Sequence, residues 1–162
     1  MTSSTIVIPL AHLEGVHLAQ LVEDFTELVG ADRDVQDPAI ARLTPTPYPE
    51  DVEAADSFAA STREDLLDRR MLDAQTVRNA LSGFRTDGEL TEDEALTPHD
   101  VVIRAGDVDA WMRTLTALRL VIAIRLGITS DDDHDPEDDR YGIYDWLGYR
   151  LETVIQAADE IS

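Results

Sequence analysis

One segment restricts more than any other how this chain can fold: Leu118-Arg119-Leu120-Val121-Ile122-Ala123-Ile124-Arg125-Leu126. It is apolar on nearly every face of a helix, which is typical of a helix surrounded by other helices. Acidic residues occupy the first turn of the same pattern, and Gly127 follows its last turn, as the helix dipole and left-handed capping favour. We therefore predict a central helix over residues 108–126, around which the other elements pack.

Two arginines, Arg119 and Arg125, interrupt this apolar pattern. A buried guanidinium group without a partner is strongly destabilising, so each of them requires a carboxylate. Asp145 and Glu152 on the last predicted helix and Glu14 on the first are the candidate partners. The preferred interpretation is a structural ion-pair network that fixes how the last two helices align. The alternative is a polar pocket around Arg119, Asp145 and Glu152 that serves an enzyme or binds a small ligand.

Apolar residues at three-and-four spacing and helix-capping residues predict the remaining helices. Asp37 is a suitable N-cap and Pro38 suits the first helical position, whereas Ser61-Thr62-Arg63-Glu64 has the capping-box pattern that begins a helix. The predicted helices cover residues 11–29, 37–43, 49–60, 61–83 and 143–159. The acidic stretches 86–100 and 129–140 are expected to be flexible loops.

Two short β-branched runs, Thr5-Ile6-Val7-Ile8 and Val101-Val102-Ile103, are the predicted strands. Since no other such run is evident, pairing them with each other is the simplest way to satisfy their backbone groups. We expect a small two-stranded ribbon formed by residues near 5–8 and 101–104. The predicted fold class is mainly α, a single-domain helical bundle over residues 1–162 around the central apolar helix.

The chain has 34 Asp and Glu residues against 13 Arg and no Lys, which gives a formal net charge of -21. A field of this sign repels polyanions, so direct binding of nucleic acid or of an anionic membrane surface is not expected. The acidity is interpreted first as keeping the protein soluble, and second as steering a basic protein partner toward it. No signal peptide and no apolar run of about 18 residues is evident, so a cytoplasmic location is expected.

No cofactor, metal site or catalytic residue is predicted. The chain has no Cys, which excludes thiol nucleophiles, disulfides and thiolate metal sites. His12 and His17 are five residues apart, not the four that would place a metal pair on one helix face. The acidic run 131–139 fails the calcium-loop template, because the required glycine falls on Pro136 and the required glutamate on Gly142.

Four arginines recur at intervals of seven or eight residues along the long middle helix and form a predicted stripe on one side of it: Arg63, Arg70, Arg78 and Arg85. The stripe is a candidate site for an acidic partner or a phosphate. Because Asp65, Asp68 and Asp73 lie between these arginines, internal pairing is the preferred interpretation.

The sequence resembles an actinobacterial family of small acidic helical proteins of unknown function, described at most as transcriptional regulators of the AosR type. The resemblance rests on Asp37-Pro38-Ala39-Ile40-Ala41-Arg42-Leu43, on the helix with Leu118-Arg119-Leu120 and Arg125-Leu126-Gly127, and on Tyr144-Asp145-Trp146-Leu147. It implies a helical regulatory or accessory protein and supplies no catalytic residue. Redox sensing by thiols, where proposed for such a family, does not fit a chain without Cys.

The leading hypothesis is a non-enzymatic regulatory or adaptor protein that acts by binding another protein, such as a component of the transcription or proteolysis machinery. Either the acidic field or the arginine stripe would provide the contact. The alternative is the enzyme or small-ligand binder described above, and a homodimer is a third hypothesis for the same charged groups.

Overall fold

Six α-helices and a two-stranded ribbon make up the part of the chain that the computed structural model describes, residues 4–34, 36–44, 52–84, 91–127 and 142–161. In chain order these elements are β1 (Thr5–Ala11), α1 (His12–Val29), α2 (Pro38–Leu43), α3 (Val52–Ala80), α4 (Glu92–Leu96), β2 (Pro98–Arg104), α5 (Val108–Leu126) and α6 (Gly142–Ile161). A 3-10 turn, Ala105–Asp107, connects β2 to α5. The predicted mainly α class is confirmed.

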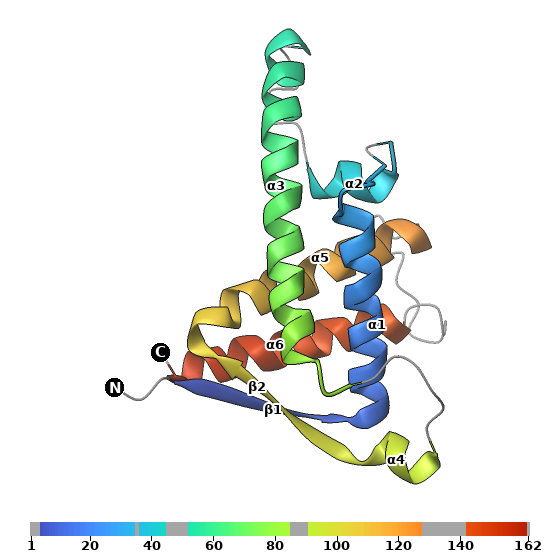
Figure 1. The fold of residues 1–162 in the computed structure, drawn as a ribbon, viewed down its shortest axis with the longest axis vertical. Coiled ribbons are helices and arrows are strands. Elements are labelled where there is room, and N and C mark those ends of the chain that lie inside the picture. The colour runs from blue at the N-terminus through green and yellow to red at the C-terminus, as the bar shows by residue number, and fades with distance from the viewer. Residues whose placement is uncertain (1–3, 35, 45–51, 85–90, 128–141, 162) are drawn as a thin grey trace.

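The central position of α5 follows from its contacts with α1, α2, α3 and α6. In Figure 1, α1 and α3 run side by side along the long axis, and α5 and α6 cross them. The bounds of α5 agree with the predicted range, and Gly127 ends it in the left-handed conformation, with φ of 75°. No helix among the described residues is both long enough and apolar enough to cross a membrane.

Burial of α5 is uneven along its length. The side chains of Trp111, Leu115 and Leu118 are buried in the core. From Leu120 to Ile124, however, the residues are only half-buried, although this part of the sequence is the most apolar. The prediction that helices surround this segment on every side is therefore wrong for the C-terminal turns of α5.

The predicted ribbon is confirmed and is longer than the β-branched runs that indicated it. Strands β1 and β2 pair antiparallel, with Ile6 opposite Ile103 and Ile8 opposite Val101. These four side chains are buried, whereas Val7 and Val102, on the other face, are exposed. The strand continues through Pro9 because a residue without an N–H is tolerated on an edge strand, and both strands of a two-stranded ribbon are edges.

The predicted boundary between two helices at residues 60 and 61 is wrong. Residues 49–60 and 61–83 were expected to form two helices, but α3 is continuous from Val52 to Ala80. No Gly or Pro interrupts this stretch, so nothing in the backbone requires the helix to stop before the capping-box pattern at Ser61.

The stretch 86–100, expected to be a flexible loop, contains α4 and the first residues of β2. Thr91 caps α4 by accepting a hydrogen bond from the backbone N–H of Glu94 at 3.2 Å. Residues 85–90 and the other predicted loop, 129–140, lie outside the described residues.

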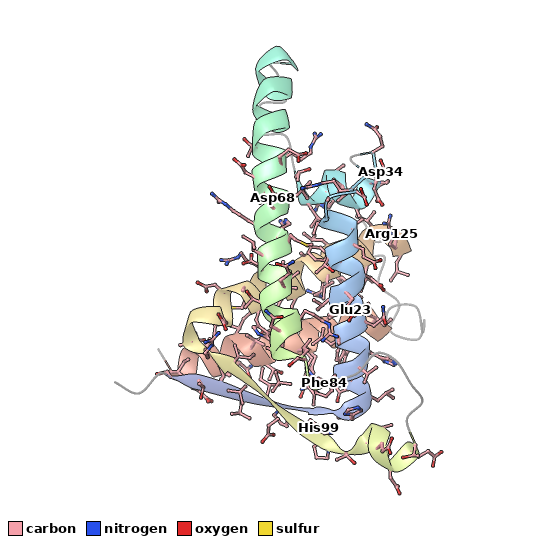
Figure 2. The ribbon with its side chains drawn as sticks, viewed as in Figure 1. Glu23, Asp34, Asp68, Phe84, His99 and Arg125 are labelled. Atoms are coloured by element: carbon pink, nitrogen blue, oxygen red, sulfur yellow. The ribbon has the colours of Figure 1, made fainter. Side chains whose placement is uncertain are left out.

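An aromatic cluster joins the start of α1 to the end of α3 and to the ribbon. The ring of Phe84 lies 5.4 Å from that of His12 and 5.7 Å from that of His99, measured between centroids. Figure 2 shows Phe84 and His99 close together beside the lower end of α1. A Cβ atom on Gly15 would lie 2.1 Å from Cε1 of Phe84, so the ring can occupy this position only because residue 15 is glycine.

We therefore expect Gly15→Ala to lower the free energy of unfolding by about 1–3 kcal/mol, because the buried Phe84 ring must shift. Urea denaturation measures the change. Gly83→Ala is the matched control, since nothing lies within 4 Å of the position its Cβ would take. Equal stabilities of the two variants would contradict this account of Gly15.

Candidate functional site

The guanidinium group of Arg119 lies against α6, but its partners differ from those predicted. Its Nε donates a hydrogen bond to the carbonyl oxygen of Tyr144 at 3.3 Å, and the group lies 4.1 Å from the centroid of the Tyr144 ring. Gly148 makes room for it, since a Cβ there would approach Nη2 to 3.0 Å. A ring face and a backbone carbonyl thus take the place of the expected carboxylates, Asp145 and Glu152, which are exposed residues of the same helix.

Arg125 pairs with Asp37 and not with α6, so the predicted pairing with Asp145 or Glu152 is wrong for this residue. Two of its nitrogens each donate to a carboxylate oxygen of Asp37 at 2.8 Å. Asp37 is also the N-cap of α2 and accepts a hydrogen bond from Ala39 N at 2.9 Å. Hydrogen bonds from Arg125 and Ala39 hold the pKa of Asp37 below its ordinary value. Figure 2 shows Arg125 on the side of the molecule where α2 lies.

Glu14 does join α1 to α6 through an ion pair, but its partner is Arg150. Its Oε2 accepts hydrogen bonds from Arg150 Nη2 at 2.6 Å and from Trp146 Nε1 at 2.7 Å. Burial alone would raise the pKa of Glu14, but the hydrogen bonds from Arg150 and Trp146 outweigh it and leave the pKa below its ordinary value. The predicted pairing of Arg119 and Arg125 with Asp145, Glu152 or Glu14 is therefore replaced by other contacts, in which Arg125 pairs with Asp37 and Glu14 with Arg150.

A hollow of about 410 Å³ lies beside Trp146, between α1 and α6. Its lining consists of Leu13, Glu14, His17, Gln20, Leu21, Gly142, Ile143 and Trp146. Arg119, Asp145 and Glu152 do not line this hollow. Nor does any group of three or more His, Asp or Glu in the described part of the chain have the arrangement of a metal site.

The predicted arginine stripe on α3 is not a uniform free surface. Arg78 is paired internally, as expected. Its partner is Glu23 of α1, at 2.7 Å, and not one of the acids of α3 itself. Arg63 is half-buried, and Arg85 lies outside the described residues. Arg70 is the member of the stripe that faces a cavity.

That cavity is a groove of about 600 Å³ between α3 and α5, which we call the α3–α5 groove. Its lining combines apolar side chains with three guanidinium groups and one carboxylate: Leu66, Arg69, Arg70, Leu72, Asp73, Met112, Arg113, Thr116 and Leu120. Sequence reasoning missed Arg69 and Arg113. The adjacency of Arg69 and Arg70 was visible in the sequence, whereas Arg113 comes from a different helix and only the packing of α5 against α3 brings it here.

The single acid of the groove is already engaged. Asp73 accepts hydrogen bonds from Arg113 Nε at 2.8 Å and from Arg113 Nη2 at 3.1 Å. These bonds raise the pKa of Arg113, while burial lowers the pKa of the half-buried Arg70. In a chain of net charge -21, the groove therefore combines a local excess of positive charge with an apolar lining.

Comparison with known families gives one match, to the family described as Domain of unknown function (DUF2017), over residues 1–158. The chain belongs to this family. No curated protein and no protein of solved structure matches it. The match includes all the residues that line the α3–α5 groove, and the function of the family is unknown.

The contacts of Glu14 predict how stability depends on pH. Because the pKa of Glu14 is lowered on folding, its ionised form stabilises the protein above the ordinary value of 4.5, and this contribution is lost as the pH falls through the lower folded-state pKa. Glu14→Gln should lower the free energy of unfolding at pH 7 by about 1–3 kcal/mol, since Arg150 loses a charged acceptor.

Urea unfolding at pH 7, 5 and 4 measures this difference, which should shrink below about pH 4.5. Glu152→Gln, at an exposed position of α6, is the control and should change little at any of these pH values. A difference between wild type and Glu14→Gln that stays constant with pH would contradict the role of the Glu14 charge.

The two functions of Asp37 can be separated by substitution. Asp37→Asn keeps an oxygen that caps α2 but loses the charge, so it should cost less than about 1 kcal/mol at this solvent-accessible pair. Asp37→Ala loses the cap as well and should cost about 1 kcal/mol more. Thermal or urea unfolding distinguishes them, and equal stabilities would show that the cap contributes nothing.

Proposed function

We propose that this chain is a non-enzymatic regulatory or adaptor protein that acts by binding another protein, and that the partner docks in the α3–α5 groove. One observation carries the proposal: Arg69, Arg70 and Arg113 surround an apolar groove in which Asp73 is the only carboxylate among the described lining residues. Grooves of this kind suit an amphipathic segment of a partner protein, whose apolar side chains enter the groove while its acidic ones meet the arginines.

The apolar part of the groove supplies the contact area. Leu66, Met112 and Leu120 are partly buried in its walls, and Leu72 stands 64% exposed at its edge. An exposed leucine between arginines matches the combination of apolar and guanidinium contacts that dominates many protein interfaces. Burial of Leu72 and of its neighbours by a partner would then contribute affinity, and the arginines would contribute orientation.

The net charge of the chain and the arginines of the groove restrict the charge that a partner can carry. The net charge of -21 repels a strongly acidic protein at long range, but this field is screened beyond about 8 Å at physiological ionic strength. At contact, the arginines of the groove act directly. The partner we propose is therefore near neutral or basic overall and carries a short acidic and apolar segment.

The resemblance to regulators of the AosR type and a cytoplasmic location both agree with a partner in the transcription or proteolysis machinery.

Site-specific cross-linking tests the proposal. A photoreactive amino acid at Thr116, an exposed residue in the groove wall, should cross-link one discrete partner in cells that express the full chain. The same reagent at Gln156, exposed on α6, is the control and should not capture that partner. Leu72→Glu should abolish the cross-link from position 116.

Cross-linked products that are the same at both positions, or that survive Leu72→Glu, would overturn the assignment of the groove. A product that joins two copies of this chain through position 116 would also overturn it, because the groove would then be a dimer contact.

A further inference from the structure

We infer that Arg70 forms an oxyanion subsite within the α3–α5 groove, flanked by Arg69 and Arg113, and that it takes a side-chain carboxylate of the docked segment. This inference rests on the proposed function, since it names the chemical group of the partner that the groove recognises. It also makes a claim about the isolated protein that can be tested without any partner.

The hydrogen bonding of Arg70 is incomplete. Its Nη2 donates to the carbonyl oxygen of Leu43 at 3.4 Å, a long contact, and its Nε is buried with no hydrogen-bond partner among the described residues. No carboxylate of the described residues lies within ion-pairing distance of it. A half-buried cation whose N–H groups lack acceptors destabilises the fold unless an anion accepts their hydrogen bonds.

Other half-buried arginines of this protein contact a carboxylate: Arg78 contacts Glu23 at 2.7 Å and Arg150 contacts Glu14 at 2.6 Å. Arg33 also contacts a carboxylate, that of Asp68 at 2.7 Å, although its Nη1 is buried without a partner. With so many acidic residues in the chain, a carboxylate for Arg70 would be easy to supply internally. Among the described residues Arg70 has none, and at a position open to a groove this points to a carboxylate that comes from outside.

The nearest acid cannot fill this role without losing its own partner. Asp73 raises the pKa of Arg70 through space, but both of its oxygens bond to Arg113. Arg113 in turn repels Arg70, because both are cations. A carboxylate placed between them would neutralise this repulsion and would accept the planar, paired hydrogen bonds that arginine offers.

The test uses the full, ¹⁵N-labelled protein and follows the Nε–Hε signals of its arginines by NMR. Acetate serves as the carboxylate probe and inorganic phosphate as a second oxyanion, each titrated at constant ionic strength. The Arg70 signal should shift saturably with acetate. The signal of Arg104, which is exposed on β2 and paired with Asp107, should move only slightly and without saturation.

Two variants make the result specific. In Arg70→Met the saturable shifts of the groove amides, such as that of Leu72, should disappear. Arg70→Lys retains the charge but lacks the planar pair of donors, so acetate should bind about tenfold more weakly. Unchanged amide dispersion shows that each variant is folded.

Three outcomes would overturn the inference: equal, linear responses of Arg70 and Arg104, saturable amide shifts that persist in Arg70→Met, or saturation by phosphate without any response to acetate. These outcomes are separate from failure of the proposed function. If position 116 captures a partner but Arg70 does not respond to anions, the docking groove is supported and the subsite is ruled out. If Arg70 responds to anions but no partner is captured, the subsite is supported and the docking groove is ruled out.

Discussion

Burial of the N-terminal half of α5 constrains where almost every other element can lie. Trp111, Leu115 and Leu118 pack in the core, and the helix contacts α1, α2, α3 and α6. Burying side chains of this size contributes about 1.5–3 kcal/mol each, which is more than any single ion pair at the surface of this protein can provide. The polar groups of α5 must therefore accommodate the packing, and this explains why Arg119 lies across a tyrosine ring and Arg125 reaches outward to α2.

Two of the ion pairs join the end of one helix to another helix. Glu14 at the start of α1 bonds to Arg150 and Trp146 of α6, and Arg125 in the last turn of α5 bonds to the N-cap of α2. Each of these acids lies near a helix N-terminus, where the helix dipole favours a negative charge. Exposed or partly exposed pairs of this kind contribute little stability, so their main effect is on how the elements are placed relative to one another.

The parts of the fold that local signals determine could be predicted from the sequence. The bounds of α5, the cap of α2 at Asp37 and the pairing of the two β-branched runs each depend on a few neighbouring residues or on the lack of an alternative partner. The partners of Arg119 and Arg125 could not, because seven-residue spacing on α6 says which acids share a face but not which helix that face meets. Asp37 lies 88 residues from Arg125 in the chain, and no pattern connects them.

The surroundings of Arg70 in the α3–α5 groove could not be predicted from the sequence either. Arg70 was recognisable as one member of a stripe, but its environment depends on Arg113 and Met112, which α5 brings to α3. In a chain with 34 acidic residues, folding supplies carboxylates to Arg33, Arg78, Arg113, Arg125 and Arg150. Among the described residues, the half-buried Arg70 has neither such a carboxylate nor the aromatic ring that takes its place at Arg119. We propose that this position is available for a carboxylate of another molecule, which would complete its hydrogen bonding.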